Sequence, residues 1–512
     1  MKITKFKNII IIVLVLSVVI GCKESIQENQ HKTQSIETSE VELYRPKFHF
    51  TPKANWMNDP NGLVYLNGNY HLFYQYYPES TVWGPMHWGH AKSKDLLHWE
   101  HRPIALYPDS LGYIFSGSAV IDKNDTSGFG KDAMVAMYTY HDPVKEKAGE
   151  IDFQTQGIAF SNDEGESWKK YENNPVIKNP GIRDFRDPKM FWNEEKSIWQ
   201  MVLVAKDHVQ FYESKNLKDW SKISEFKFKD NPPLGVWECP DLFKLKVDGT
   251  QEEKWVLIVS HGNGAPNGGS GTRYFVGDYD GTSFTTNQKT SRWVDYGTDN
   301  YAGVTFNNEP NDKRIFIGWM SNWNYATTTP TKTWRSAMTL PRELSLYKNN
   351  NQYYLKSGLL KGFAAITNAI PENEITGEVP YAFSYDKLQE SMISFDAEIQ
   401  DSINIILSNN NNEAFKISYD TVEGILRLDR SQSGQVDFNE KFKNSSNQTL
   451  SIGKVDKLSF KLVLDASSIE IFINEGDYVM TNQIFPTENY TSFRLNKEVI
   501  IKNFKINSIS HD

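Results

Sequence analysis

The 512-residue sequence contains very little cysteine and no excess of positive charge. Cysteine occurs only at Cys22 and Cys239, which excludes a disulfide-stabilised scaffold. Asp and Glu number 64 against 55 Lys and Arg, a formal net charge of −9, which argues against a nucleic-acid-binding protein. Hydrophobic residues still make up 39% of the chain, enough for sizeable cores, and the length favours two packed units.

Long hydrophobic runs are also scarce, and the clearest lies near the N-terminus, from Ile9 to Ile20. Twelve helical residues cover about 18 Å, short of the roughly 30 Å hydrocarbon core of a membrane. A secretory signal peptide over residues 1–21 is therefore favoured over a membrane-spanning helix. The run ends in Val19-Ile20-Gly21-Cys22, which resembles a bacterial lipobox and predicts lipidation of Cys22. The alternative is an ordinary cleavage site beside an incidental cysteine.

Residues 22–42 are rich in Glu, Gln, Ser and Thr and contain few apolar side chains. Such a segment cannot bury a core, so it is expected to form a flexible tether with a root-mean-square span of about 25 Å. We therefore expect an exported protein that a lipid anchor attaches to a membrane, at the outer membrane or the cell surface. A periplasmic or secreted protein is the alternative.

Between residues 43 and 346, short β-type runs alternate with turn residues, and amphipathic helical periodicity is nearly absent. Compact apolar strands recur about every 60 residues, beginning at Tyr70, Met134, Trp199, Trp255 and Arg314. This repeat predicts an all-β fold with a five-bladed β-propeller over residues 43–346; a long β-sandwich or a β-helix is the alternative. After a linker region at 347–372, alternating strands predict a C-terminal β-sandwich over 373–512.

A second recurring segment precedes each apolar strand and is expected to be the innermost strand of its blade. Acidic residues stand at the start of three of these segments: Asp59, Asp187 and Glu238. Inner strands run along the channel of a propeller, so their first residues converge at one mouth. Converging carboxylates raise one another's pKa, which is typical of active sites. Taken singly, each segment is equally a tight turn, an exposed Arg–Asp pair or a strand start with a chance acid.

Longer motifs surround these acids: WMNDPNG at 56–62, FRDP at 185–188 and WECP at 237–240. Further motifs are FYQY at 73–76, WGPMHWGHA at 83–91, FSGSAV at 115–120, DYGTDNYA at 295–302, GWMSNW at 318–323 and IEIFINEG at 469–476. In these motifs the chain resembles glycoside hydrolases of family 32, the fructan hydrolases and invertases. The resemblance extends from about Arg45 to the C-terminus.

The resemblance implies a retaining enzyme that releases fructose from β-fructofuranosyl substrates, such as levan, inulin or sucrose, with no metal or other cofactor. It implies Asp59 as the nucleophile, Glu238 as the general acid and then the base, and Asp187 as a stabiliser of the transition state. The charge of Asp59 is expected to favour the protonated form of Glu238. The residues assigned to the fructosyl pocket are Asn58, Gln75, Trp83, Phe115, Ser116, Arg186, Asp299 and Trp319.

Alternatives remain for the mode of attack and for the substrate. Exo-acting hydrolysis is favoured, because an aromatic wall is expected to close one end of the channel; its members are Trp56, Trp83, Phe115 and Trp319. An endo-acting levanase is the close alternative. An arabinan-type furanosidase of the same fold and a non-catalytic glycan-binding lipoprotein are further alternatives. The motifs at 56–62 and 185–188 favour fructose, and three intact acids argue against a pure binder. The sequence does not indicate an oligomeric state.

Overall fold

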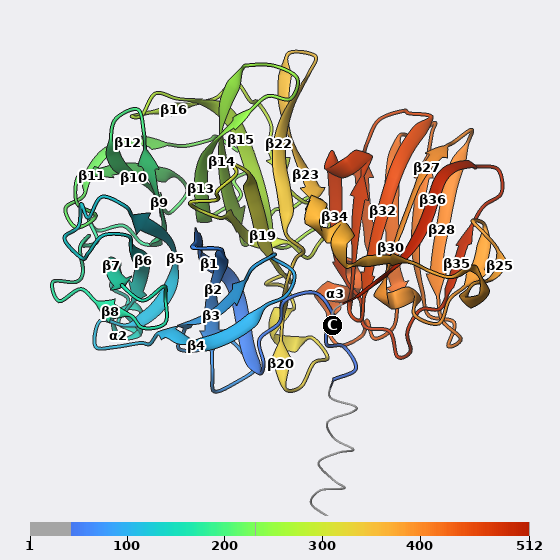
Figure 1. The fold of residues 1–512 in the computed structure, drawn as a ribbon, viewed down its shortest axis with the longest axis horizontal. Helices are drawn as coiled ribbons and strands as arrows, with labels where there is room; N and C mark the ends of the chain where they lie inside the picture. The colour runs from blue at the N-terminus through green and yellow to red at the C-terminus, as the bar shows by residue number, and fades with distance from the viewer. Residues whose placement is uncertain (1–41, 231, 511–512) are drawn as a thin grey trace, which may run out of the picture. The chain divides into compact units, whose positions relative to one another are not determined.

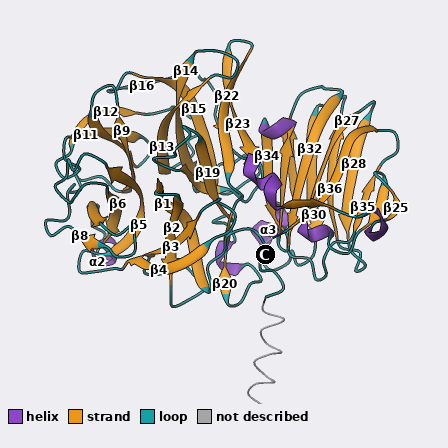
Figure 2. Ribbon diagram, viewed as in Figure 1, coloured by secondary structure: helices purple, strands orange, loops and turns teal. Residues whose placement is uncertain are grey.

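The computed structural model describes residues 42–230 and 232–510. The predicted signal peptide, the lipidation site at Cys22 and the tether up to residue 41 lie outside the described residues. Strands dominate the rest of the chain, which confirms the predicted all-β class (Figures 1 and 2). The described residues contain two α-helices of five residues each, α2 (Pro143–Lys147) and α3 (Glu440–Asn444). Within this part of the chain, no helix is long and apolar enough to cross a membrane.

Five antiparallel sheets, drawn in blue to yellow in Figure 1, make up the first part of the described chain. The first sheet contains β1 (Asn55–Leu66), β2 (Asn69–Tyr77), β3 (His87–Ser93) and β4 (Glu100–Leu106). The second contains β5 (Tyr113–Asp122), β6 (Ala133–His141), β7 (Gln154–Ser161) and β8 (Lys169–Lys170). The third contains β9 (Phe185–Asn193), β10 (Ile198–Ala205), β11 (Val209–Ser214) and β12 (Ser221–Phe226).

The fourth sheet contains β13 (Trp237–Lys246), β14 (Glu253–His261), β15 (Gly271–Tyr279), β16 (Phe284–Thr285) and β17 (Arg292–Trp293). The fifth contains β18 (Tyr301–Thr305), β19 (Arg314–Met320), β21 (Ala337–Met338), β22 (Arg342–Asn349) and β23 (Gln352–Leu359). The first strands of neighbouring sheets contact one another, in the order β1, β5, β9, β13, β18 and back to β1. The sheets therefore form a closed ring, the predicted five-bladed β-propeller.

Hydrogen bonds between the first and last blades close this ring. The short strand β20 (Trp334–Arg335) pairs in parallel with β1, with Trp56 opposite Arg335. The Asn307 amide donates to the Leu63 carbonyl at 2.9 Å, and the Tyr65 amide donates to the Asn307 carbonyl at 3.0 Å. The inner edge of the first blade is thus paired with the end of the fifth.

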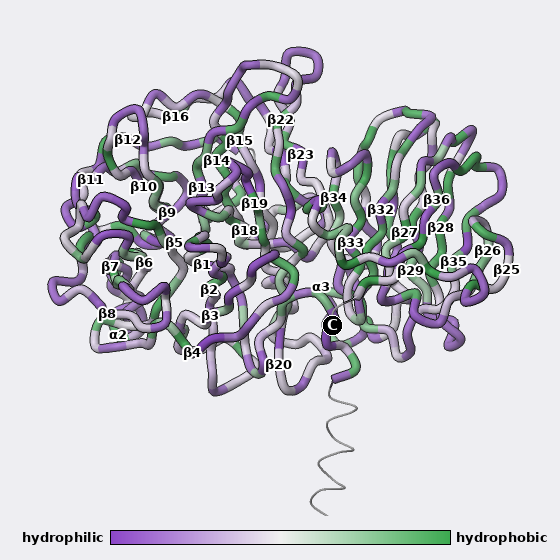
Figure 3. The backbone as a smooth tube through the Cα atoms, in the orientation of Figure 1, coloured by the Kyte–Doolittle hydropathy of each residue, from purple (hydrophilic) through white to green (hydrophobic). Residues whose placement is uncertain are grey.

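The second strand of each blade is buried on both faces. In β14, Leu257 and Val259 pack into the core between the third and fourth blades, whereas Val256 and Ile258 pack between the fourth and fifth. A strand covered on both sides needs apolar residues at every position. This explains the continuous apolar runs that define the repeat in the sequence, and in Figure 3 hydrophobic residues gather along the strands and hydrophilic ones in the loops.

Two further sheets form the predicted C-terminal β-sandwich, drawn in orange and red in Figure 1. One is ordered β24 (Thr367–Ala369), β36 (Ile500–Ile509), β27 (Ser391–Glu398), β32 (Lys457–Asp465), β33 (Ser468–Ile473) and β34 (Tyr478–Gln483). The other is ordered β25 (Thr376–Glu378), β26 (Ala382–Ser384), β35 (Ser492–Leu495), β28 (Ser402–Ser408), β29 (Ala414–Asp420), β30 (Ile425–Gln432) and β31 (Asn447–Ser451). Alternate residues of β28, Ile403, Ile405 and Leu407, are fully buried in the shared core.

The structure assigns strands to part of the stretch predicted as a linker, residues 347–372. Strand β23 pairs with β22 along its whole length and completes the fifth blade, and β24 pairs with β36 of the sandwich. Strand β34 differs from the other long strands of the sandwich in its composition. Its buried polar residues Thr481, Asn482 and Gln483 interrupt the apolar pattern, and Thr481 and Gln483 bond to the propeller instead of packing into an apolar core.

Candidate active site

Each inner strand of the propeller has a β-bulge near its first residues. In every case two residues of the inner strand lie opposite one residue of the second strand. The bulged pairs are Asn58-Asp59 in β1, Phe115-Ser116 in β5, Asp187-Pro188 in β9, Cys239-Pro240 in β13 and Ala302-Gly303 in β18. A bulge bends its strand and redirects the side chains beside it. The blades therefore present most of the predicted site residues at or next to a bulge.

Three of these bulges also hold a residue in the left-handed region of backbone space. Asp187 has φ = 64°, Cys239 has φ = 45° and Ala302 has φ = 54°. None of the three is a glycine, so each position carries a conformational strain that the surrounding ring maintains. Proline follows Asp187 and Cys239, at bulge positions where the ladder does not need the missing N–H.

Asp59 is held through both of its carboxylate oxygens and is 8% exposed. Its Oδ1 accepts a hydrogen bond from Nδ2 of Asn58 at 2.9 Å, and its Oδ2 accepts one from the Ser116 hydroxyl at 2.7 Å. Trp56 Nε1 donates to Oδ1 of Asn58 at 2.7 Å and so fixes the orientation of that amide. The first two blades thus hold the Asp59 carboxylate in one orientation.

Glu238 precedes the bulge of β13, and 24% of its side chain is exposed. Arg186 Nη2 donates to its Oε1 at 2.9 Å, and the Tyr301 hydroxyl donates to its Oε2. Burial raises the pKa of Glu238 above its ordinary value, the Arg186 guanidinium opposes this, and the charge of Asp59 raises the pKa further. The direction in which Asp59 acts on Glu238 is therefore the predicted one.

Arg186 is shared among several carboxyl groups of the mouth. Its Nη1 donates to Asp184 at 2.7 Å, its Nη2 bonds Glu238, and its Nε lies 3.9 Å from Oδ2 of Asp187. Burial raises the pKa of Asp187 to about 7, although Arg186 acts in the opposite direction. One guanidinium does not offset this many buried acids, so the mouth retains a proton near neutral pH.

Cys239 lies between two of the acids. Its backbone N–H donates to Oδ2 of Asp187 at 3.0 Å, and its Sγ lies 3.4 Å from Oδ2 of Asp59. Burial, together with the charges of Asp59 and Asp187, raises the pKa of the Cys239 thiol well above its ordinary value. Cys239 therefore remains a thiol and serves as a donor to the acids around it.

Aromatic side chains adjoin the Asp59 carboxylate through both of its hydrogen-bonding neighbours. Next to Ser116, the Phe115 ring stacks on His141 at a centroid distance of 4.2 Å, and Trp83 meets Phe115 edge-on at 6.0 Å. Trp83 is 40% exposed. On the Asn58 side, the fully buried Trp56 packs against both Trp319 and Trp323, with its ring centroid 6.0 Å from each of theirs. The centroids of Trp319 and Trp323 are 4.9 Å apart.

The structure brings together most of the predicted residues, and three of them are buried. Gln75 is buried and links the first two blades, because its Nε2 donates to Asn61 at 2.7 Å and to the Ile114 carbonyl at 3.0 Å. Trp319 is fully buried, so it supports the aromatic group from behind. Asp299 is also fully buried and bonds to Arg430 of the sandwich at 2.9 Å, away from the hydrogen bonds that join the three acids.

Sequence reasoning missed several residues that take part in the cluster, above all Tyr301, Cys239 and His141. Tyr301 occupies the position in β18 that Glu238 occupies in β13, directly before a bulge. This equivalence depends on the positions of the bulges, which the sequence alone does not show. His141 ends β6 and contacts Phe115, and no local motif marks it.

The geometry provides an oriented carboxylate beside a carboxyl group whose pKa is raised. Hydrolysis of a glycosidic bond by double displacement requires these two groups, one as nucleophile and one as proton donor. Among the described residues, no group of three or more His, Cys, Asp and Glu side chains is arranged to hold a metal ion.

Comparisons with known proteins agree with this chemistry. The profile of the glycosyl hydrolases family 32 N-terminal domain matches residues 49–357, and that of the family 32 C terminal matches residues 365–508. A levanase of Bacillus subtilis (strain 168) is 45% identical over 474 residues, which cover 89% of this chain and 68% of the relative. An extracellular exo-inulinase of Aspergillus niger is 40% identical over 494 residues, covering 88% of this chain and 91% of that protein.

Solved structures show the same likeness. The crystal structure of exo-inulinase from Aspergillus awamori is similar with a TM-score of 0.82 and 36% identity, over 91% of this chain and 98% of that one. The two family profiles cover the propeller and the sandwich. The chain therefore belongs to the glycosyl hydrolases of family 32 and is a glycosidase that hydrolyses O-glycosyl bonds.

Proposed function

We propose that the protein is a retaining, exo-acting β-fructosidase that removes terminal fructose from fructans of the levan or inulin type. The observation that carries this proposal is the contrast between Asp59, held by donors on both oxygens, and Glu238, whose pKa is raised. The names of the relatives, levanase and exo-inulinase, support a fructan as the substrate.

In the proposed reaction, Asp59 attacks the anomeric carbon of the terminal fructosyl unit while Glu238 protonates the departing glycosidic oxygen. The transition state is oxocarbenium-like, so the negative charge of Asp59 stabilises the positive charge that develops on the same carbon. The product of this step is a fructosyl ester of Asp59. Because the ester is neutral, Glu238 then loses its proton more readily and can deprotonate the water that hydrolyses the ester.

Asp187 and Arg186 are proposed to bind the fructosyl hydroxyls. Asp187 is 5% exposed, and the carboxylate is anchored by the Cys239 N–H. Burial beside Arg186 gives the pair a fixed geometry, which suits recognition of a ring that moves toward a flattened transition state. Asn58 and Ser116 complete the pocket through their hydrogen bonds to Asp59.

The aromatic group next to Ser116 supports exo attack. Trp83 is exposed and meets Phe115 edge-on, so apolar rings adjoin the Asp59 carboxylate on the Ser116 side. On the Asn58 side, Trp56 is fully buried and supports the site from behind. An exo enzyme needs a pocket closed around a terminal ring, whereas an endo enzyme needs a groove open on both sides of the acids. The early product profile on levan tests this: free fructose alone supports exo attack, and a ladder of oligosaccharides at low conversion contradicts it.

The acid role is tested with Glu238→Gln and two substrates. Loss of a general acid lowers the rate by about 10²- to 10⁴-fold when the leaving group needs a proton. We expect such a loss on levan or inulin and much smaller loss on an activated aryl fructoside, whose leaving group departs without protonation. Equal losses on both substrates would contradict Glu238 as the general acid. Release of arabinose from arabinan, in place of fructose from a fructan, would contradict the proposed substrate.

We also propose that the protein is exported and that lipidation of Cys22 anchors it to a membrane, with residues 23–42 as the tether. The extracellular exo-inulinase relative supports export, and the lipobox-like Val19–Cys22 segment supports the anchor. Cys22→Ala should release the protein into the soluble fraction or block its processing. Recovery of the unaltered protein in the soluble fraction would contradict the anchor.

A further inference from the structure

We infer that the C-terminal sandwich is a working part of the active site, because it holds the loop of residues 294–300 that delivers Tyr301 to the acid Glu238. In this view Arg430 and Asp299 are positioning residues for catalysis. The inference rests on the proposed role of Glu238, and its test below separates the two.

The loop covers the open edge of a sandwich sheet. Strand β34 is the last strand of its sheet, so one side of its backbone needs partners. The Tyr296 amide donates to the Val479 carbonyl at 2.8 Å, and the Asp299 amide donates to the Thr481 carbonyl at 3.2 Å. Between them, Gly297 lies so close that an added Cβ would be 2.2 Å from the Thr481 carbonyl oxygen. The loop therefore continues the sheet as an extra strand would.

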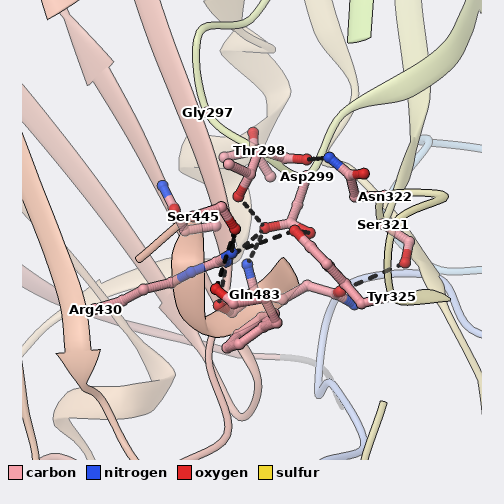
Figure 4. A network of polar contacts seen from close by, with 12 residues as sticks. Gly297, Thr298, Asp299, Ser321, Asn322, Tyr325, Arg430, Ser445 and Gln483 are labelled. Carbon is pink, nitrogen blue, oxygen red and sulfur yellow. Dashed lines mark hydrogen bonds and ion pairs between the residues drawn. The ribbon is translucent and has the colours of Figure 1, made fainter. Parts of the chain in front are cut away.

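A buried hydrogen-bond network locks the end of this loop (Figure 4). One oxygen of Asp299 accepts a hydrogen bond from Arg430 Nη1 at 2.9 Å and another from the backbone N–H of Gln483 at 2.9 Å. The other accepts from the Tyr325 hydroxyl at 2.7 Å. Asp299 and Arg430 have no exposed surface, so the carboxylate cannot turn away without leaving a buried charge unpaired.

The locked loop leads directly into the catalytic mouth. Tyr301 comes two residues after Asp299 and starts β18, and its hydroxyl donates to Oε2 of Glu238. Its ring is buried and meets Trp319 edge-on at 6.1 Å. Because Tyr301 precedes a bulge, its position depends on where the loop enters the strand. The sandwich holds that loop together with the propeller residues Asn322 and Arg342.

A second loop beside Glu238 is held by the sandwich in the same way. A Cβ added to Gly262 would lie 3.9 Å from Oε2 of Glu238, so the loop of residues 262–270 begins next to the acid. In that loop, Asn267 accepts from the Thr449 amide of β31 at 2.8 Å and donates to the Tyr296 carbonyl at 2.7 Å. The two loops that flank the acid are therefore bonded to the sandwich and to each other.

The expected effect on chemistry has a definite sign. A hydroxyl that donates to a carboxylate stabilises its ionised form, so removing or displacing Tyr301 should raise the pKa of Glu238. The alkaline limb of the kcat/KM profile, which reports the protonated acid, should move to higher pH. Misplacing the acid should also slow reactions that need proton donation, by up to about 10²-fold for a 1 Å error.

The test replaces Arg430 with methionine and compares two substrates. We expect Arg430→Met to lower kcat on levan or inulin about tenfold or more, with little change on an activated aryl fructoside, and to move the alkaline limb upward. Tyr301→Phe should shift the limb in the same direction, and Arg430→Lys should restore part of the rate. If Arg430→Met does not fold, Tyr325→Phe removes only the hydroxyl bonded to Asp299 and should act in the same way more weakly.

Two controls separate positioning from stability. Arg427→Met removes an exposed arginine of the same strand, β30, and should leave the kcat on both substrates unchanged. Leu407→Ala opens a cavity in the sandwich core and should lower Tm without changing the substrate ratio or the pH profile.

Equal losses on both substrates with an unmoved alkaline limb would overturn the inference. A failure of this inference and a failure of the proposed function give different results. If Glu238→Gln distinguishes the two substrates and Arg430→Met does not, only the role of the sandwich is wrong. If Glu238→Gln does not distinguish them, the proposed acid is wrong.

Discussion

The mouth of the propeller and its interface with the sandwich both bury clusters of acids, yet the two regions treat these acids in opposite ways. At the interface, cations are inserted between the carboxylates: His49 bonds Asp465 and Glu470, at 2.7 Å and 2.9 Å, and Arg342 bonds Glu470 and Asp295, at 2.6 Å and 2.8 Å. At the mouth, one cation, Arg186, contacts Asp184, Asp187 and Glu238.

The pKa directions follow this difference. Burial alone raises the pKa of a carboxyl group in either region. At the interface, hydrogen bonds and charge from His49 and Arg342 outweigh burial, and the pKa values of Asp465 and Glu470 fall below their ordinary range. At the mouth burial prevails, and the pKa values of Asp187 and Glu238 rise. Burial therefore does not distinguish a catalytic acid from a structural one, whereas the supply of counter-charges does.

The largest expected effect is a loss of turnover at the mouth of the propeller without a loss of stability. Asp59→Asn should reduce turnover of levan or inulin by more than about 10⁴-fold, because it removes the proposed nucleophile. The Tm should stay the same or rise, since one of several crowded acids becomes neutral. Steady-state rates and thermal unfolding of the same preparation check both parts, and a variant with near-normal turnover would show that Asp59 is not the nucleophile.

The converse variant, at the interface between propeller and sandwich, should lose stability and keep its activity. Glu470→Gln leaves Arg342 and His49 with too little negative charge, and removing one partner of a buried ion pair destabilises a protein by about 3–5 kcal/mol. Urea unfolding should show this loss, while the folded fraction keeps its turnover. The matched control is Glu475→Gln, which removes an exposed acid paired with Lys461 and should change stability by less than about 1 kcal/mol. Similar losses in both variants would contradict the comparison.

A third variant, Asp187→Asn, tests the contrast through the sign of its effect on stability. The pKa of Asp187 is about 7 in the folded protein and ordinarily 3.8, so the folded state binds its proton more tightly than the unfolded state does. Stability contributed by Asp187 therefore falls as pH rises from about 4 to 7. Asp187→Asn should stabilise the protein by up to about 4 kcal/mol at pH 8 and have little effect at pH 4, with turnover lost. Destabilisation at pH 8 would place Asp187 with the structural acids.

The smallest expected effect concerns His49. Burial lowers its pKa, but Asp465 and Glu470 outweigh burial and raise it from 6.5 to about 9. The stabilisation from protonated His49 is complete below pH 6.5 and is lost as pH rises through about 9. Unfolding measured from pH 6 to 10 should show a loss of up to about 3 kcal/mol that His49→Gln abolishes. An unchanged slope in the variant would assign the pH dependence to other groups.

The sequence was most informative where side chains repeat. The apolar strands of the blades are buried on both faces, so their period of about 60 residues is visible without any homologue, and the acids at the inner segments converge as expected. Bulges were not visible, because Asp187, Cys239 and Ala302 adopt positive φ without being glycines. Tyr301 is not an acid, so the pattern of acids at the inner strands does not include it.

Asp299 illustrates the opposite case. The resemblance assigned it to the fructosyl pocket, because the motif at 295–302 could be recognised while its partner strand could not. Strand β34 is rich in buried polar residues whose partners lie about 180 residues earlier in the chain, such as Gln483 with Asp299. Local periodicity carries no information about such pairs, so only the fold shows that Asp299 faces the sandwich.

The closure of the ring by β20 has a consequence for the order in which the molecule is completed. Trp56 and Arg335 are about 280 residues apart, so this pairing forms late, after the intervening blades exist. A nascent chain that stops before Asn307 has four sheets and an unpaired inner edge on β1, the strand that carries Asp59. We therefore expect an incomplete chain to expose a strand edge that favours aggregation.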